Sequence, residues 1–388
     1  MAKEIGRYTK TIISLVVIFG LATPAFSADP GISKDRILIG ANLPLQSGFA
    51  AGAKQLGDGA DAYLEYINDA GGINGRKIER LVENDSYNPQ QAVAVVKKLV
   101  DRDGVFAIVS TIGTSTNLAI LPFLAERGVP FINPCGGDDR LNRPTDRIIF
   151  AWVPPGTING MDMANYALDT LRAKRVGIFY QNDKFGKDPR DGVVEALAKR
   201  GMKPVGEATY IPSDVDVSAQ VIALKRADAD IVIMACIPKP GSLFLIEAQK
   251  LGWKPKFLGM NTMADPITPG LAGSALDDMY INFFTAVETM ENPDLKKANE
   301  ILAKYRPETK PGYWSYLGMS GAIVFVEGVK RAGRDLTREK LIVAIETFKD
   351  FRLGVVPPLT FGPGNHGNAD KFGYAIWKDG KLKVLKAW

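Results

Sequence analysis

The 388-residue sequence has few of the side chains from which metal and catalytic sites are most often built. It contains a single histidine, His366, in the turn-like stretch Gly-Pro-Gly-Asn-His-Gly-Asn. Zinc sites need clustered His and Cys ligands, and a Ser-His-Asp triad needs a well-placed histidine base. The sequence therefore gives little support for a metal, a cofactor or an enzyme. We expect His366 to be no more than a turn residue.

Cysteine is also scarce: the two cysteines, Cys135 and Cys236, lie far apart along the chain. An oxidising compartment would allow a disulfide between them. Both, however, follow apolar runs of the kind that form strands. This setting favours two buried free thiols over a disulfide.

Long runs of one charge are missing. The 48 Lys and Arg residues and the 43 Asp and Glu residues are mixed along the chain, and no basic stretch is interleaved with aromatic residues. Such a pattern gives no support for nucleic acid binding. Beyond the N-terminus, no segment is long and apolar enough to cross a bilayer.

The N-terminus itself has the pattern of a secretory signal peptide. Basic residues precede an apolar run of about ten residues at 12–21, which is too short to span a bilayer comfortably. Small residues at 25–28 follow and suit a signal peptidase, so we expect residues 1–27 to be removed. No cysteine lies near this point, so we expect no lipid anchor. Export to a periplasm follows from this pattern.

The length of the chain favours two domains. Strand-like and helix-like segments alternate along most of it. The expected strands are 36–43, 77–83, 105–109, 129–132, 148–152, 175–181, 203–210, 231–235, 257–260 and 279–285, with a closing hairpin at 372–377 and 382–385. The expected helices are 53–69, 88–102, 118–127, 158–171, 186–199, 219–226, 242–251, 293–305, 313–331 and 338–347. This alternation predicts two doubly wound, Rossmann-like α/β lobes with parallel sheets, which bind ligands beyond the carboxyl ends of their strands.

One such strand end stands out, in the stretch 109–117. It reads as the end of a buried strand, a glycine turn and the start of a helix. Gly113 allows a tight turn and the close approach of a ligand. Thr114, Ser115 and Thr116 offer hydroxyls where a helix has unpaired N–H groups and a partial positive charge. The stretch therefore suits a carboxylate, although these residues could instead only cap the helix.

Several segments resemble one family of binding proteins. Residues 71–78, with the sequence Gly-Gly-Ile-Asn-Gly-Arg-Lys-Ile, are similar to a signature of periplasmic solute-binding proteins of the branched-chain amino acid type. These proteins are the two-lobed, type I receptors of ABC importers. Further similar segments are 84–85, 88–93, 127–134, 183–186, 257–259 and 372–377. The resemblance runs in order through essentially the whole chain after the N-terminus.

The resemblance implies how the chain is divided. Lobe 1 would take residues 29–154 and 285–361, and lobe 2 would take residues 155–284 and 365–388. Three crossings between the lobes would form a hinge, and the ligand would be trapped when the lobes close. The partners implied are a small molecule with a carboxylate and an inner-membrane permease with its ATPase subunits. The protein would be a monomer and would not be an enzyme.

The resemblance also assigns the carboxylate end of the site. Thr114 falls on the position that binds the ligand carboxylate, with Gly113 and Ser115 beside it. The loop after the fourth strand, which includes Gly136 and Gly137, would contribute backbone groups. The hydroxyl that relatives usually carry in this loop is missing at Gly137.

Lobe 2 would supply the opposite wall of the site through Phe185, Ile237 and Asn261. Asn261 stands where amino acid binders carry an acidic residue that pairs with the ligand ammonium group. A buried ammonium without a charged partner is costly. Other carboxylates could replace the missing one, namely Asp138, Asp139, Asp183 or Asp265. Branched-chain or related amino acids and aromatic or aliphatic organic acids thus both remain candidate ligands.

Two further functions are alternatives to a transport receptor. The same fold serves exported sensor subunits that report a ligand to a membrane receptor. An enzyme on a doubly wound fold is the third alternative, but the sequence contains no nucleophile elbow, dinucleotide glycine fingerprint or metal cluster.

Overall fold

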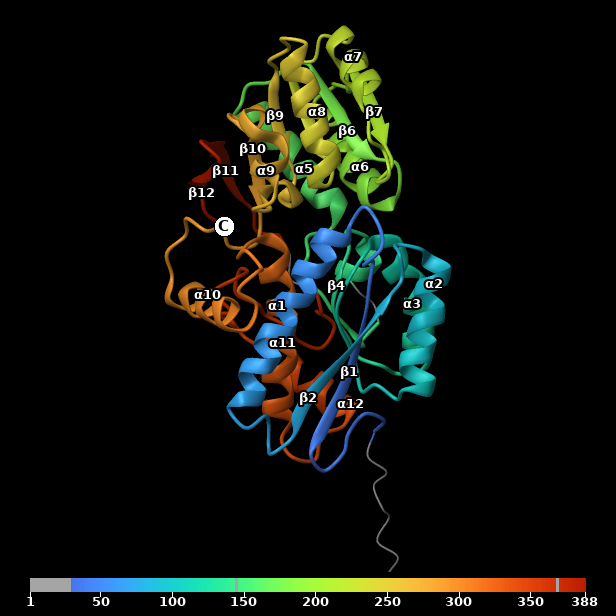
Figure 1. The fold of residues 1–388 in the computed structure, drawn as a ribbon. Helices are drawn as coiled ribbons and strands as arrows, with labels where there is room; N and C mark the ends of the chain where they lie inside the picture. Colours follow the sequence, from blue (N-terminus) through green and yellow to red (C-terminus); the bar gives the residue numbers. More distant parts are fainter. Residues whose placement is uncertain (1–28, 144–145, 368–369) are drawn as a thin grey trace, which may run out of the picture.

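A computed structural model describes residues 29–143, 146–367 and 370–388, so the expected signal peptide at 1–27 lies outside the described residues. The described chain forms two α/β halves, one above the other in Figure 1. Strands β1 to β5 form one sheet, and strands β6 to β12 form the other. Within the described ranges the chain passes between the halves from β5 to α5, from β10 to α10 and from α12 to β11.

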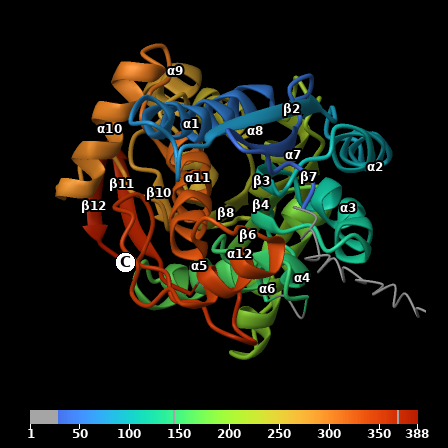
Figure 2. The same cartoon turned by 90° about the horizontal axis from the view of Figure 1, so that it is seen from below.

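The first sheet is entirely parallel, as the alternation of strands and helices predicts. In spatial order its strands are β2 (Lys77–Asn84), β1 (Arg36–Leu43), β3 (Ile108–Ile112), β4 (Phe131–Cys135) and β5 (Ile149–Phe150). Its helices are α1 (Ala50–Asp69), α2 (Pro89–Lys97), α3 (Thr114–Glu126), α4 (Asp139–Asn142), α10 (Pro293–Tyr305), α11 (Tyr313–Ala332) and α12 (Arg338–Glu346), and a π-helical turn at Lys98–Arg102 continues α2. Helices α1 and α11 lie side by side, as Figure 2 shows from below.

The second sheet has a parallel part and an antiparallel edge. In spatial order its strands are β12 (Lys381–Lys386), β11 (Gly373–Lys378), β10 (Tyr280–Phe283), β9 (Lys256–Gly259), β8 (Ile231–Ala235), β6 (Val176–Gln181) and β7 (Gly206–Tyr210). Only β11 runs against its neighbours, because the closing hairpin joins it to β12. The helices are α5 (Gly156–Asp169), α6 (Lys184–Ala198), α7 (Ser218–Arg226), α8 (Pro238–Lys250) and α9 (Thr268–Ala272).

Two strands of the first sheet lie further along the chain than the sequence predicts. The strand expected at 105–109 is β3 at 108–112, and the strand expected at 129–132 is β4 at 131–135. The prediction placed the strand ends at the first polar residues. In the structure Ser110 donates its hydroxyl hydrogen bond to the carbonyl of Gly318 at 3.0 Å, and Asn133 donates to the carbonyl of Leu317 at 2.8 Å. Because α11 supplies these acceptors, polar side chains can be buried inside the strands.

Some helices differ from the expectation in their bounds or were not expected. Helix α1 begins at Ala50 rather than 53, and α8 begins at Pro238 rather than 242 because a proline is well suited to the first turn of a helix. The short elements α4, α9 and the 3₁₀ turns at Asn261–Ala264 and Gly273–Leu276 carry too few residues for a periodic signal.

His366 is more than a turn residue, which corrects the expectation from sequence. It is 3% exposed and stacks on the Phe150 ring, with the ring centroids 4.1 Å apart. Its Nδ1 lies 3.1 Å from the carbonyl oxygen of Ile149, and its Nε2 lies 3.0 Å from a carboxylate oxygen of Glu346. The histidine thus ties the segment after α12 to strand β5.

Both cysteines are buried and free, as their apolar surroundings predict. Burial raises the pKa of each thiol well above its usual value, so both stay protonated and unreactive. Among the described residues, no helix combines the length and the apolar character needed to cross a membrane.

Candidate ligand-binding site

A pocket, partly open to solvent, lies between the two halves of the molecule. The lower half lines it with the carboxyl ends of β3 and β4, with Phe49 directly before α1, and with the first residues of α11. The upper half lines it with α5, α6 and the segment after β9. The lining residues are Phe49, Tyr87, Ile112, Gly113, Thr114, Cys135, Gly136, Gly137, Val153, Pro154, Gly156, Asn159, Phe185, Pro189, Met260, Asn261, Tyr313 and Trp314.

One end of the cavity is the N-terminus of α3. Gly113 precedes the helix with a φ of 128°, and a Cβ at this position would lie 2.2 Å from the Thr116 hydroxyl, so only glycine fits. No described side chain accepts a hydrogen bond from the first N–H groups of α3, and the residue at the N-cap has no side chain to do so. Uncapped N–H donors at a helix start, together with the helix dipole, favour negatively charged groups.

Thr114 does not cap this helix through its side chain. It is 1% exposed, and its hydroxyl oxygen accepts a hydrogen bond from the N–H of Gly137 at 3.1 Å. The hydroxyl proton has no acceptor among the described residues, so it is available to a ligand oxygen. The capping interpretation of Thr114 therefore has less support than the carboxylate interpretation.

In the glycine loop after β4, several backbone groups already form hydrogen bonds within the protein. The carbonyl of Gly136 accepts from the Asn142 side chain at 2.6 Å, and the carbonyl of Gly137 accepts from the N–H of Gly156 at 2.6 Å. The N–H of Gly137 is bound to Thr114 and its carbonyl is bound to Gly156, so Gly137 links the start of α3 to the start of α5. The loop thus positions Thr114 more than it offers free donors of its own.

The sequence-predicted residues are brought together only in part. Gly113, Thr114, Gly136 and Gly137 line the cavity, and so do Phe185 and Asn261 from the other half. Ser115, although it follows Thr114 in α3, is not among the lining residues. Ile237 is not a lining residue either: it is buried at the start of α8, where its N–H donates to the Tyr210 hydroxyl at 3.0 Å.

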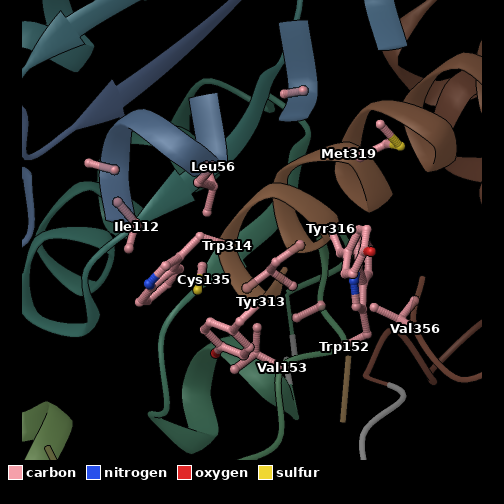
Figure 3. Packing of buried hydrophobic residues seen from close by; sticks show 14 of the residues in the cluster. Leu56, Ile112, Cys135, Trp152, Val153, Tyr313, Trp314, Tyr316, Met319 and Val356 are labelled. Carbon is pink, nitrogen blue, oxygen red and sulfur yellow. The ribbon is translucent and has the colours of Figure 1, made fainter. Parts of the chain in front are cut away.

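Four aromatic lining residues were missed from sequence: Phe49, Tyr87, Tyr313 and Trp314. Phe49 and Tyr87 follow the ends of β1 and β2, so the strand-end rule could have found them. Tyr313 and Trp314 begin α11, far along the chain, and no local signal marks them. Figure 3 shows both rings close to Cys135 and Val153.

Two polar contacts join the halves close in sequence to residues that line the cavity. The Tyr87 hydroxyl donates to a carboxylate oxygen of Asp183 at 2.9 Å. Burial, followed by the charge of Asp183, raises the pKa of Tyr87 well above its usual value, so this donor stays protonated. Lys184 of α6 lies 3.2 Å from a carboxylate oxygen of Asp138. Burial works against the ionised form of Asp138, but its hydrogen bonds with Arg140 and Lys184 outweigh this and hold its pKa below the usual value.

None of the carboxylates considered from sequence lines the cavity. Asp138 and Asp183 are engaged in the contacts just described, and Asp139 lies 3.5 Å from the Thr157 hydroxyl. Asp265 is completely buried, and burial raises its pKa to about 6. No group of three or more His, Cys, Asp or Glu side chains in the described ranges is arranged to hold a metal ion.

Comparison with known proteins gives a consistent picture. A family model described as "Periplasmic binding protein" matches residues 36–381. The chain is 26% identical to "Leu/Ile/Val-binding protein homolog 3" of Brucella melitensis biotype 1 over 371 residues, which are 94% of this chain and 99% of that protein.

Solved structures share the fold. A fatty acid ABC transporter substrate-binding protein from Thermomonospora curvata matches with a TM-score of 0.86 and 23% identity, over 93% of this chain and 94% of the other. A branched chain amino acid ABC transporter protein from Thermus thermophilus with bound valine matches with a TM-score of 0.84 and 19% identity, over 92% and 97%. These likenesses show the two-sheet α/β fold, with mostly parallel strands, that the sequence predicts.

Proposed function

The chain belongs to the periplasmic binding protein family, and from this premise we propose that it captures a small solute that carries a carboxylate. The solute is held between two lobes and delivered to an inner-membrane ABC permease with its ATPase subunits. The protein works in the periplasm after removal of residues 1–27, as a monomer and without catalysis. Its similarity to the Brucella and Thermomonospora proteins supports a role in transport.

The observation that carries this proposal is the anion site at α3. The helix begins without a side-chain cap, the Thr114 hydroxyl is free to donate, and both face a cavity that residues of the two halves line. A carboxylate placed there would accept hydrogen bonds from the N–H groups and from Thr114. Contacts to both halves would then favour the closed arrangement.

The division into lobes is part of the same proposal. We assign residues 29–154 and 285–361 to lobe 1, and residues 155–284 and 365–388 to lobe 2. The five-stranded sheet and α10 to α12 fall in the first assignment, and the seven-stranded sheet falls in the second. The connections between the lobes would act as a hinge.

A thermal-shift screen tests the function. Amino acids, aromatic acids and fatty acids are compared with their amides, which keep the shape but lose the negative charge. A carboxylate ligand at about 100 times its dissociation constant should stabilise the protein by roughly 2.7 kcal/mol. The proposal is wrong if no carboxylate raises the melting temperature, or if the amides raise it equally.

A further inference from the structure

Building on the proposed function, we propose that the natural ligand is an aromatic carboxylate without an ammonium group. The proposal concerns the same cavity and narrows the class of solute. It rests on three features of that cavity: the charge of its walls, the polar group opposite Thr114, and the arrangement of its aromatic rings.

The walls of the cavity carry no side chain that is charged at neutral pH. The carboxylate of a ligand accepts hydrogen bonds from the first N–H groups of α3 and from the Thr114 hydroxyl. An ammonium group enclosed in the same space would lose its water without gaining a negative partner, which disfavours it strongly. A ligand with one negative charge therefore fits these walls better than a zwitterion.

Asp183, Asp188 and Asp265 lie outside the lining of the cavity, and each accepts at least one hydrogen bond within the protein. Asp183 accepts from Tyr87 and also from the Gln181 side chain at 2.7 Å. Asp188 pairs with Lys184 at 2.7 Å. Asp265 is fully buried and does not line the cavity. Its carboxylate accepts a hydrogen bond from the N–H of Ile267 at 2.9 Å. None of the three lines the cavity, so the lining itself offers no carboxylate to a bound amine.

Asn261 is the polar group that the upper half presents to the cavity after β9. It is 2% exposed, and its side-chain oxygen has no hydrogen-bond partner among the described residues. A ligand donor would satisfy this acceptor, because buried polar groups are normally hydrogen-bonded. Since the amide is neutral, it matches a neutral polar group on the ligand, such as a ring hydroxyl, better than a charged amine.

The aromatic residues form a wall for a flat ring rather than a cage for a cation. Phe49 stacks on Tyr87 with the ring centroids 4.5 Å apart, and the Phe185 ring meets Phe49 at 87° and 5.8 Å. Tyr313 and Trp314 meet each other at 72° and 4.6 Å. One face of Phe49 and one face of Tyr87 cover each other, so these two faces are not available to an ammonium group. A planar aromatic ligand can add offset-stacked or edge-to-face contacts with these rings.

The first test uses matched ligands on the mature wild-type protein, with isothermal titration calorimetry. The compounds 3-phenylpropanoate and phenylalanine differ only by the ammonium group. Benzoate and cyclohexanecarboxylate differ by the planarity of the ring. We expect 3-phenylpropanoate to bind at least 100-fold more tightly than phenylalanine, and benzoate at least 10-fold more tightly than cyclohexanecarboxylate.

The outcomes separate this inference from the proposed function. Phenylalanine or leucine binding as tightly as 3-phenylpropanoate would overturn the inference and leave a carboxylate receptor intact. Tighter binding of cyclohexanecarboxylate or decanoate would equally overturn the aromatic part. If none of these carboxylates binds, the inference fails, whereas the proposed function fails only if the wider thermal-shift screen also finds no carboxylate ligand.

The second test changes the charge opposite Thr114. The variant Asn261→Asp places a carboxylate in the cavity wall, so 3-phenylpropanoate should bind at least 10-fold more weakly and phenylalanine at least 10-fold more tightly. The control is Asn165→Asp, on the exposed face of α5 beside Arg200, which should change neither affinity. Equal weakening of both ligands in folded Asn261→Asp protein would contradict the role given to Asn261. The wild-type comparison remains decisive if the variant does not fold.

Discussion

At the scale of single residues, the Thr114 side chain is fixed by one hydrogen bond while its hydroxyl proton has no acceptor among the described residues. Its hydroxyl oxygen accepts from Gly137, which fixes the side chain, and its proton remains available to a ligand. A residue positioned in this way is organised before the ligand arrives. Little entropy then has to be lost on binding.

We therefore expect Thr114→Ala to weaken carboxylate binding about 10- to 100-fold, because hydrogen bonds to charged groups are worth about 1.5–3 kcal/mol. Stability without ligand should fall by no more than about 1 kcal/mol, since Gly137 is only half-buried and its N–H can reach water. Calorimetry and urea unfolding measure the two quantities. Thr114→Ser keeps the hydroxyl and is the control. A large loss of stability with unchanged affinity would show that Thr114 is structural.

At the scale of elements, the packing of α1 against α11 places part of the site. A Cβ on Gly59 would lie 1.9 Å from the carbonyl oxygen of Ser315, and a Cβ on Gly318 would lie 1.8 Å from that of Leu56. The two helix backbones therefore touch. This close approach brings the first residues of α11, including Trp314, to the cavity beside the start of α1.

Replacing Gly59 by alanine should force α1 and α11 apart. Helix propensity alone would favour alanine by about 1 kcal/mol, but the clash with Ser315 should dominate and lower stability by about 1–3 kcal/mol. Urea unfolding measures the difference. The control is Gly270→Ala in α9, where a Cβ meets nothing within 4 Å, so stability should hold or rise slightly. Equal stability of Gly59→Ala and wild type would contradict the close packing.

At the scale of the whole molecule, the two halves contact each other directly. The Tyr87–Asp183 hydrogen bond and the Lys184–Asp138 ion pair join them, and a Cβ on Gly48 would lie 2.7 Å from the carbonyl of Pro212. These contacts exist only when the halves are close together. They should therefore stabilise the closed arrangement that holds a ligand.

Tyr87→Phe removes the hydroxyl that bonds Asp183 and keeps the ring that stacks on Phe49. We expect ligand affinity to fall about 5- to 10-fold, the effect of losing roughly 1–1.5 kcal/mol from the closed state. Small-angle scattering should show compaction with ligand in both proteins, at a higher ligand concentration in the variant. Tyr63→Phe, which removes a hydroxyl without a hydrogen bond to any described residue, should behave as wild type. Unchanged affinity in Tyr87→Phe would show that the Tyr87–Asp183 hydrogen bond does not stabilise the closed arrangement.

The sequence by itself determined what depends on neighbours along the chain. Alternating apolar strands and amphipathic helices specified the doubly wound architecture, because local periodicity decides which face of an element is buried. The glycine turn and hydroxyls at 113–116 marked a helix start able to receive an anion, and the strand ends indicated the edge where ligands bind. The signal peptide and the lobe boundaries remain predictions.

Tertiary structure alone decided what depends on residues distant in sequence. Strands β3 and β4 continue through Ser110 and Asn133 because α11 supplies carbonyl acceptors. His366 can be buried because Glu346 and Ile149 lie within hydrogen-bond distance of its two ring nitrogens. Trp314 reaches the cavity through the glycine contacts of α1 and α11. Long-range packing fixes these positions, and no local pattern of the chain encodes which distant partner will be present.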